Sequence, residues 1–338
     1  MASLRDSLSY TPAELTFGTS GLRDLVSSMT DLECYINAAG FLKFLVAQNR
    51  LNKGEPVLLA GDLRESTPRV LAAVHQAITD GGFSSEYHGL VPTPAVAYAA
   101  LEKSAPCIMV TGSHIPADRN GIKFYKKDGE ILKADEAAIK QFIQAERKAM
   151  YEQEMAVSSF DKDGSLKMQS NLPAEDTGAA TIYQERYLSV FDSQCLAGKK
   201  IVFYLHSAVG RDLLVDLFTK LGAEVIPAGR SDVFVPIDTE NVTPEHLAYF
   251  KQLAETHPGV FAIVSTDGDS DRPFVNDETG TFHRGDVLGA VVASWLKADA
   301  AAFPVTTNDA VDEYLTDKEI PFVRTKIGSP SVIKTMQE

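Results

Sequence analysis

Ser113 stands at the end of a short apolar run, where the chain enters a loop of turn-forming residues. Residues 107–113 read CIMVTGS, which predicts a buried strand, and residues 111–123 read TGSHIPADRNGIK. Open α/β sheets bind ligands at loops that follow the carboxyl ends of strands, so such a site would present Ser113 with His114 and Lys123 nearby. The Gly-x-Ser-x-Gly elbow of α/β-hydrolases does not surround Ser113. Ser, Pro, Asn and Gly also form plain polar turns, and that interpretation stays open on composition alone.

Three carboxylates alternate with small residues in a second loop. Residues 265–273 read STDGDSDRP and follow an apolar run. Asp267, Asp269 and Asp271 repel one another unless a cation joins them, and hard oxygen ligands suit magnesium or calcium. An EF-hand is disfavoured because Arg272 stands where its turn requires glycine. The sequence therefore predicts a magnesium loop, with Arg272 beside it for a phosphate-bearing ligand; a solvated acidic turn is the alternative.

A third loop, near the start of the chain, is rich in backbone N–H groups that a small anion can reach. Residues 17–26 read FGTSGLRDLV. Thr19 and Ser20 lie between two glycines, and the side chain of Arg23 can point into the same concavity, which predicts an anion nest. Loops of glycine and serine are common without a ligand, so this motif alone does not establish a phosphate site.

Alternating strands and helices must position these loops. The alternation restarts near residues 199 and 285, which suggests three related α/β units. Asp128-Gly129 lies between short apolar runs in residues 121–133, which is a hairpin signal, and residues from about 156 to 195 resemble a polar linker or surface hairpin. The expected strands are 56–62, 107–113, 199–207, 223–229, 260–267, 303–307 and 321–328, and the expected helices are 67–82, 134–151, 212–222, 244–259, 285–298, 310–319 and 329–338.

The composition limits the classes of partner. Acidic residues outnumber basic ones, 46 to 32, and the net charge of −14 argues against nucleic acid or an anionic membrane as partners. The sequence contains no apolar run long enough for a transmembrane helix and no secretory signal at its start. Cys34, Cys107 and Cys195 are few and widely spaced, which fits a reducing, cytoplasmic location.

Taken in order, the three loops resemble the motifs of the α-D-phosphohexomutase family. Residues 18–23 match its GTSGxR loop, residues 111–123 its T-[GA]-S-H-x-P…NGxK phosphoserine loop, and residues 267–272 its DGDxDR metal loop. Three such motifs in the right order and spacing form a specific match that covers essentially the whole chain. One departure is Ile115, because the commonest form of the family has asparagine between the histidine and the proline.

The resemblance implies consecutive related α/β domains, with mixed sheets flanked by helices, arranged around a central cleft. The expected boundaries are 1–155 for a first domain with the phosphoserine loop, 156–277 for a second with the metal loop, and 278–338 for an incomplete third. A fourth domain, which clamps the substrate phosphate in the family, is expected to be absent, so the 338-residue chain alone is expected to be a poor mutase. Lys326 and Ser329 match a segment near the sugar, where some phosphomannomutases have histidine instead of Ser329.

The resemblance also implies a reaction. A phosphorylated Ser113 would exchange its phosphoryl group with a hexose phosphate through a hexose bisphosphate, and Mg²⁺ would neutralise the transferred charge. Lys123 is the expected general acid/base, with a pKa lowered by the metal ion and by arginine. The expected catalytic residues are Ser113, Lys123, His114 and Arg23; the metal ligands are Ser113, Asp267, Asp269 and Asp271; the substrate-binding residues are Thr19, Ser20, Arg23, Arg272, Lys326 and Ser329.

Mannose or glucose phosphate is the expected substrate, with glucosamine phosphate as the alternative. A catalytically silent sugar-phosphate-binding protein is less favoured because Ser113, Lys123 and all three aspartates are present. A phosphatase with a phosphoserine intermediate is a less favoured alternative, which would be distinguished by the release of free phosphate instead of an isomer. The sequence gives no indication of the oligomeric state.

Overall fold

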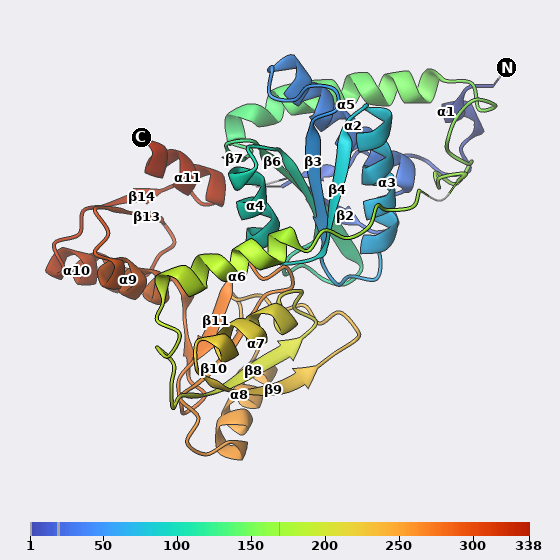
Figure 1. The fold of residues 1–338 in the computed structure, drawn as a ribbon. Helices are drawn as coiled ribbons and strands as arrows, with labels where there is room; N and C mark the ends of the chain where they lie inside the picture. The colour runs from blue at the N-terminus through green and yellow to red at the C-terminus, as the bar shows by residue number, and fades with distance from the viewer. Residues whose placement is uncertain (1, 19–20, 169) are drawn as a thin grey trace.

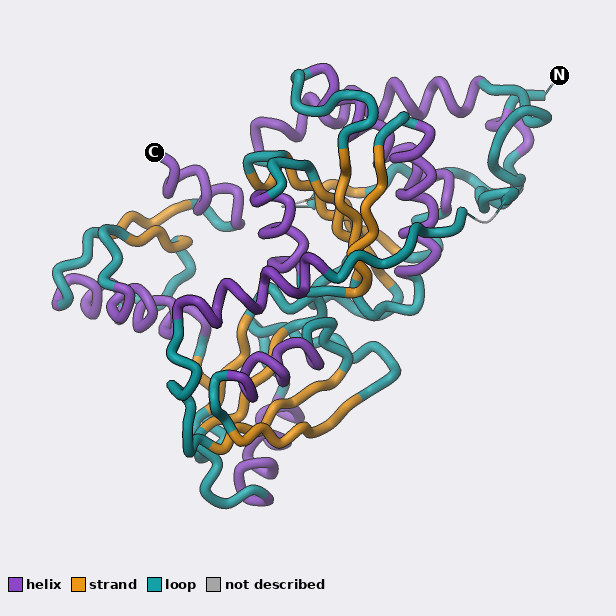
Figure 2. The backbone as a smooth tube through the Cα atoms, in the orientation of Figure 1, coloured by secondary structure: helices purple, strands orange, loops and turns teal. Residues whose placement is uncertain are grey.

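Three β-sheets, each with helices against it, follow one another along the part of the chain that the structure describes (Figure 1). The structure is a computed structural model, and it describes residues 2–18, 21–168 and 170–338. Helices flank the strands throughout (Figure 2). The predicted fold class, consecutive α/β units with mixed sheets flanked by helices, is therefore confirmed.

The first unit is built on a mixed sheet in the order β1-β2-β6-β5-β3-β4, with β7 paired to β6. Its strands are β1 Thr16–Phe17, β2 Gly21–Leu25, β3 Pro56–Gly61, β4 Ser84–Leu90, β5 Cys107–Val110, β6 Arg119–Lys126 and β7 Gly129–Glu130. Its helices are α1 Leu4–Ser7, α2 Asp31–Ala47, α3 Thr67–Asp80, α4 Thr93–Glu102 and α5 Lys133–Glu152. Strands β4, β3 and β5 run parallel, whereas β6 and β2 run antiparallel to their neighbours.

The pleat of this sheet separates two hydrophobic cores. Successive side chains of a strand point to opposite faces. Ile122 and Phe124 of β6 enter the core formed with α2, α3 and α5, whereas Met109 of β5 enters the core formed with α4 and α6 (Gly178–Val190). Tyr125 of β6 packs against that second core. The face covered by α4 and α6 therefore also receives the side chain of Lys123, between Ile122 and Phe124.

The second unit has a sheet in the order β12-β11-β10-β8-β9. Its elements are β8 Lys200–His206, α7 Arg211–Lys220, β9 Glu224–Arg230, α8 Pro244–Thr256, β10 Ala262–Thr266, β11 Pro273–Asn276 and β12 Phe282–His283. Thr243 caps α8 by accepting a hydrogen bond from the N–H of His246, and Pro244 occupies the first turn, so sequence and structure agree on where this helix begins.

Helix α6 joins the first two units. Ala179 and Tyr183 pack into the core beside α4, while the Nε2 atom of Gln184 donates hydrogen bonds to Leu213 and Asp216 of α7. Figure 1 shows α6 lying between the two sheets. The polar linker predicted for residues 156–195 is therefore wrong over Gly178–Val190, because a few apolar residues on one helical face suffice to anchor it.

The third unit has a short parallel sheet of β13 (Ala301–Pro304) and β14 (Phe322–Thr325). Its helices are α9 Gly285–Leu296, α10 Ala310–Asp317 and α11 Ser329–Gln337. Trp295 of α9 stacks on Phe191, at the end of α6, with ring centroids 5.7 Å apart. Helix α11 lies beside β7 and α4 of the first unit (Figure 1).

Most of the predicted elements are confirmed, within a few residues at their ends. The hairpin at Asp128-Gly129 is present as β6 and β7. The strand predicted at 303–307 instead spans Ala301–Pro304. The sequence analysis did not predict α2, β4 or α4. Among the described residues, no helix combines the length and the apolar character needed to cross a lipid bilayer.

His206 should make the stability of the second unit depend on pH. Its Nε2 atom lies 2.9 Å from the carbonyl oxygen of Thr266, and burial lowers its pKa from 6.5 to about 4. As the pH falls, the imidazole of the unfolded chain therefore binds a proton near pH 6.5, whereas the buried imidazole of the folded chain stays neutral until about pH 4. The contribution of His206 to the free energy of unfolding is complete above pH 6.5. It is lost as the pH falls from 6.5 to about 4, by up to about 3 kcal/mol.

Urea unfolding of the unmodified chain and of His206→Gln, each followed by circular dichroism between pH 7.5 and pH 4, checks this expectation. Glutamine can occupy a similar volume without titrating. The difference in unfolding free energy between the two chains should shrink as the pH falls. Parallel pH profiles would show that His206 is not the group responsible.

Candidate active site

Ser113 lies in the loop after β5, with its side chain buried and its backbone in the left-handed region at φ 56°. Its N–H donates to the Oγ1 atom of Thr111 at 2.8 Å, and Thr111 in turn donates to the carboxylate of Asp62 at 2.8 Å. The Ser113 hydroxyl donates to Oδ2 of Asp267 at 2.7 Å. The first and second units therefore meet at this serine.

The acidic loop follows β10 and returns as β11. Asp267 and Asp269 are buried, and the side chain of Asp271 is 29% exposed. One oxygen from each carboxylate lies within 4.8 Å of the other two. Ser270 adopts φ 58°, and its Oγ accepts a hydrogen bond from the N–H of Gly210 at 3.0 Å, which holds the turn against the start of α7. The predicted cluster of three carboxylates is present.

Lys123 neutralises part of this cluster. Its Nζ atom donates to Oδ2 of Asp269 and to Oδ2 of Asp271, each at 2.6 Å. Burial opposes the charge on Lys123, but these two carboxylates outweigh it and hold its pKa well above the ordinary value. A metal ion and arginine were expected to lower this pKa, whereas the carboxylates alone raise it.

The surroundings shift the pKa values of two of these carboxylates in opposite directions. Burial and the negative charges of Asp269 and Asp271 raise the pKa of Asp267. Burial also works against the charge on Asp269, but the Lys123 ammonium reverses this effect and lowers the pKa of Asp269. Oδ1 of Asp269 is buried and has no hydrogen-bond partner. An unpartnered carboxylate oxygen among hard donors fits a divalent metal ion, so the three carboxylates and the neighbouring Ser113 hydroxyl form a candidate metal site.

His114 and two arginines lie near the serine. Nδ1 of His114 lies 3.2 Å from the Ser113 Oγ. Burial lowers the pKa of His114, and the neighbouring Arg272 and Arg23 add to the effect. Arg272 donates to Glu240 at 3.0 Å. Arg23 lies on β2, in register with Gly121 of β6, so the structure brings both predicted arginines to the neighbourhood of His114.

The remaining predicted substrate residues are Thr19, Ser20, Lys326 and Ser329. Thr19 and Ser20 fall outside the described residues. Lys326 follows β14 in the third unit, and Ser329 is the first residue of α11. These two residues belong to the surroundings of α11 and not to the carboxylate cluster.

Thr93 is a site residue that the sequence analysis missed. Its Oγ1 atom donates to Oδ2 of Asp269 at 2.6 Å, and its N–H donates to the Asp269 carbonyl at 2.9 Å. It begins α4, directly after β4, and Pro92 and Pro94 flank it. The sequence signal that could have indicated Thr93 is a threonine between two prolines. Because β4 and β5 both run parallel to β3, the loop after β4 lies at the same edge of the sheet as the loop after β5.

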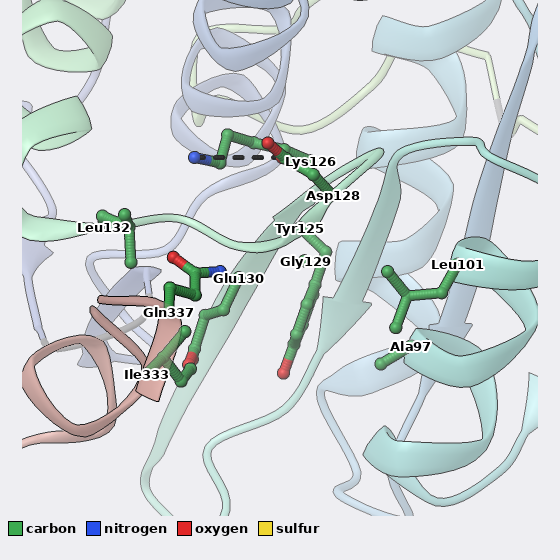
Figure 3. A pocket seen from close by; sticks show the side chains of 10 residues that line it. All are labelled: Ala97, Leu101, Tyr125, Lys126, Asp128, Gly129, Glu130, Leu132, Ile333 and Gln337. Atoms are coloured by element: carbon green, nitrogen blue, oxygen red, sulfur yellow. Dashed lines mark ion pairs between the residues drawn. The ribbon is translucent and has the colours of Figure 1, made fainter. Parts of the chain in front are cut away.

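A cavity of about 270 Å³ lies away from this cluster, between the β6–β7 hairpin, α4 and α11 (Figure 3). Tyr125 and Glu130 face Ile333 and Gln337 across it. Lys126 in its wall is already paired with Asp135 at 2.7 Å. The chemistry described above therefore lies outside the cavity.

Three models of one enzyme family match most of the chain. Residues 14–150, 182–280 and 284–338 match the phosphoglucomutase/phosphomannomutase α/β/α domains I, II and III, respectively. The chain therefore belongs to the phosphoglucomutase/phosphomannomutase family, the α-D-phosphohexomutases, and the resemblance seen in the three motifs is confirmed.

Individual relatives carry names within this family. A phosphomannomutase of Sinorhizobium fredii is 39% identical over 95% of this chain and 65% of its own length, and one of Salmonella muenchen is 40% identical over 94% and 62%. A phosphoglucosamine mutase of Burkholderia ambifaria is 30% identical over 95% of this chain and 70% of its own length. The chain thus spans somewhat less than two thirds of the length of the two phosphomannomutases.

The fold is also similar to a solved structure. A phosphoglucomutase/phosphomannomutase family protein of Burkholderia thailandensis aligns with a TM-score of 0.75 and 22% identity, over 97% of this chain and 69% of its own. At this identity the similarity concerns the fold alone.

Replacing Asp269 should weaken metal binding. Asp269→Asn removes the charge of a buried candidate ligand and is expected to lower the affinity for Mn²⁺ by at least about tenfold, measured by isothermal titration calorimetry. Lys123→Ala should bind Mn²⁺ at least as tightly as the unmodified chain, because Nζ competes for the same carboxylate oxygens. Asp299→Asn, an exposed change in the third unit, is the control. Equal affinities for Asp269→Asn and the control would contradict the site.

Proposed function

We propose that this chain carries the phosphoserine and metal-binding parts of a phosphohexomutase, an isomerase that interconverts hexose 6-phosphate and hexose 1-phosphate. The observation that carries the proposal is the hydrogen bond of the Ser113 hydroxyl to Asp267 at 2.7 Å, which joins a serine on one unit to the acidic loop of the next. In the proposed reaction phospho-Ser113 gives its phosphoryl group to a sugar hydroxyl, the hexose bisphosphate turns around, and its other phosphate returns to Ser113.

Phosphoryl transfer depends mainly on in-line positioning and on neutralising the charge of the transferred group. Mg²⁺, held by Asp267, Asp269, Asp271 and an oxygen of phospho-Ser113, would supply charge neutralisation when bound. Arg23 and the nearby Arg272 would add positive charge around the phosphoryl oxygens.

Lys123 is proposed to move the proton of the reacting hydroxyl. Its ammonium sits 2.6 Å from carboxylates on either side, which support its charged form. As an ammonium, Lys123 can donate a proton to the departing serine oxygen once it replaces a carboxylate contact with one to the substrate. It can take a proton from the sugar hydroxyl only after it has given up its own. His114, at 3.2 Å from the serine oxygen, is placed to orient that oxygen or to share the role.

Mannose and glucose phosphates are the proposed substrates. The relatives named phosphomannomutase are 39% and 40% identical, whereas the relative named phosphoglucosamine mutase is 30% identical. Lys326 and Ser329 are proposed to lie near the sugar, and Thr19 and Ser20 near its phosphate. Phosphoglucosamine mutase is the second candidate.

The domain boundaries 1–155, 156–277 and 278–338 belong to the same proposal. We also propose a cytoplasmic location, which the buried free thiols of Cys34 and Cys107 support because such thiols stay reduced there.

Two alternative functions differ in their products. A phosphatase would release free phosphate instead of an isomer, and a silent binding protein would release neither. A coupled assay of the full-length protein with mannose, glucose and glucosamine phosphates separates these outcomes.

Ser113 should accept a phosphoryl group. Incubation of the chain with Mg²⁺ and a hexose 1,6-bisphosphate is expected to add one phosphate, located at Ser113 by peptide mapping. Ser113→Ala should not be phosphorylated, and Ser207→Ala, a buried serine at the end of β8, should behave as the unmodified chain does. Phosphate on another residue, with Ser113 unmodified, would end the phosphoserine hypothesis.

Replacement of Lys123 should slow turnover without loss of metal. Lys123→Ala is expected to lower kcat of the full-length protein by roughly 10²–10⁴-fold, the usual contribution of a general acid or base. Lys127→Ala, at a partly exposed position after the same strand, serves as the matched control. Retained turnover in Lys123→Ala would assign the proton transfer to His114 or to water.

A further inference from the structure

Arg64 is a buried arginine directly behind the Ser113 loop, and the proposed reaction does not use it. It follows β3, and its side chain is only 1% exposed. Its Nε atom lies 3.3 Å from Oδ2 of Asp62, whose side chain is fully buried. A buried ion pair contributes little net stability on its own, so the other partners of this guanidinium group indicate its role.

The guanidinium group donates to four backbone carbonyls of the serine loop. Nη2 donates to Ser113 at 3.0 Å and Ile115 at 2.6 Å, and Nη1 donates to Pro116 at 2.7 Å and Arg119 at 2.8 Å. The planar fork of arginine fixes the directions of all these donors at once, which the single ammonium group of lysine cannot do. One side chain therefore holds together four carbonyls of the loop from Ser113 to Arg119.

The Asp62–Arg64 pair holds Ser113 from both sides of its backbone. Arg64 binds the Ser113 carbonyl, while Asp62 accepts from Thr111, whose Oγ1 accepts the Ser113 N–H. Ser113 has φ 56°, a left-handed conformation that residues other than glycine avoid unless their surroundings enforce it. This conformation directs the hydroxyl toward Asp267 at 2.7 Å.

Phe234 connects this arrangement to the acidic loop. Its ring covers the Arg64 guanidinium, with Cζ of the arginine 3.9 Å from the ring centroid. The tip of the ring lies against Gly268, where a Cβ atom would come within 2.8 Å of Cζ of Phe234 and 2.6 Å of the Ser113 carbonyl oxygen. Phe234 thus contacts both Arg64, behind the serine loop, and Gly268, the residue between Asp267 and Asp269.

We propose that Arg64, with Phe234 stacked on it, is a positioning residue that holds the Ser113 hydroxyl in line with the acidic loop for phosphoryl transfer. The proposal rests on the phosphoserine function above. Arg64 does not touch the reacting atoms; it acts through the backbone of residues 113–119. Its loss should therefore impair transfer while leaving the metal ligands in place.

Arg64→Lys keeps the positive charge and removes the fork. In this variant we expect phosphorylation of Ser113 by a hexose 1,6-bisphosphate to slow by at least about 100-fold under single-turnover conditions. Mn²⁺ affinity should change by less than about threefold. Hydrogen exchange at the amides of Ser113, Ile115 and Arg119 should accelerate by at least about tenfold, while peptides from β8 and β10 keep their rates. Arg69→Lys, an arginine that binds Asp31 at 2.7 Å in the same unit, is the matched control.

Free guanidinium distinguishes positioning from general destabilisation. Arg64→Ala leaves space for the ion, and low millimolar guanidinium should restore phosphorylation at least tenfold in this variant, with no effect on Arg64→Lys. Phe234→Leu retains an apolar cover but loses the aromatic face, and we expect transfer to slow by about three- to tenfold. If the Arg64 variants fail to fold, Phe234→Leu with the same exchange measurement decides the proposal.

Phosphorylation and exchange at unmodified rates in Arg64→Lys would overturn the proposal. A slow reaction that follows a loss of helical circular dichroism, without rescue by guanidinium, would also overturn it. If the unmodified chain itself accepts no phosphate, the proposed function fails, and the exchange rates alone then decide whether Arg64 holds the loop.

Discussion

Mutual repulsion of three carboxylates is the constraint on which the site depends. Asp267, Asp269 and Asp271 place ligand oxygens within 4.8 Å of one another. Two unit charges about 4 Å apart repel by about 4 kcal/mol at an effective dielectric constant of about 20. Such a loop is stable only where another part of the protein supplies a cation or donors. The first unit supplies Lys123, Thr93 and the Ser113 hydroxyl, so the electrostatics of the second unit require the first.

The sheet of the first unit meets this requirement through ordinary strand geometry. Lys123 lies between Ile122 and Phe124, whose side chains are fully buried in the larger core. The alternation of the pleat turns the lysine to the opposite face, toward the acidic loop. The close approach of β2 depends on Gly21, since a Cβ atom there would collide with the backbone of Ile122. The same strand, β6, therefore contributes Ile122 and Phe124 to the core and places the charge of Lys123 beside the acidic loop.

The local chemistry of the site could be predicted from the sequence, but its long-range pairings could not. The apolar strands and the turn residues that follow them predicted that Ser113 and the three aspartates lie on loops. The contacts of Lys123 with Asp269 and Asp271 span two units, and no local pattern encodes them. Helix α2 was missed because it is buried on nearly every side and lacks the polar stripe of an amphipathic helix. Helix α4, rich in alanine, lacks that contrast for the same reason.

The stacking of Trp295 on Phe191 gives the protein a built-in optical reporter. Trp295 is the only tryptophan of the chain, so its indole emission comes from a single place. That place is the contact between α9 of the third unit and the end of α6, with ring centroids 5.7 Å apart. The indole is also 63% exposed, which makes its emission sensitive to any change in hydration. Tryptophan fluorescence excited near 295 nm should therefore change when the third unit separates from α6. It should not change when a rearrangement is confined to the serine loop.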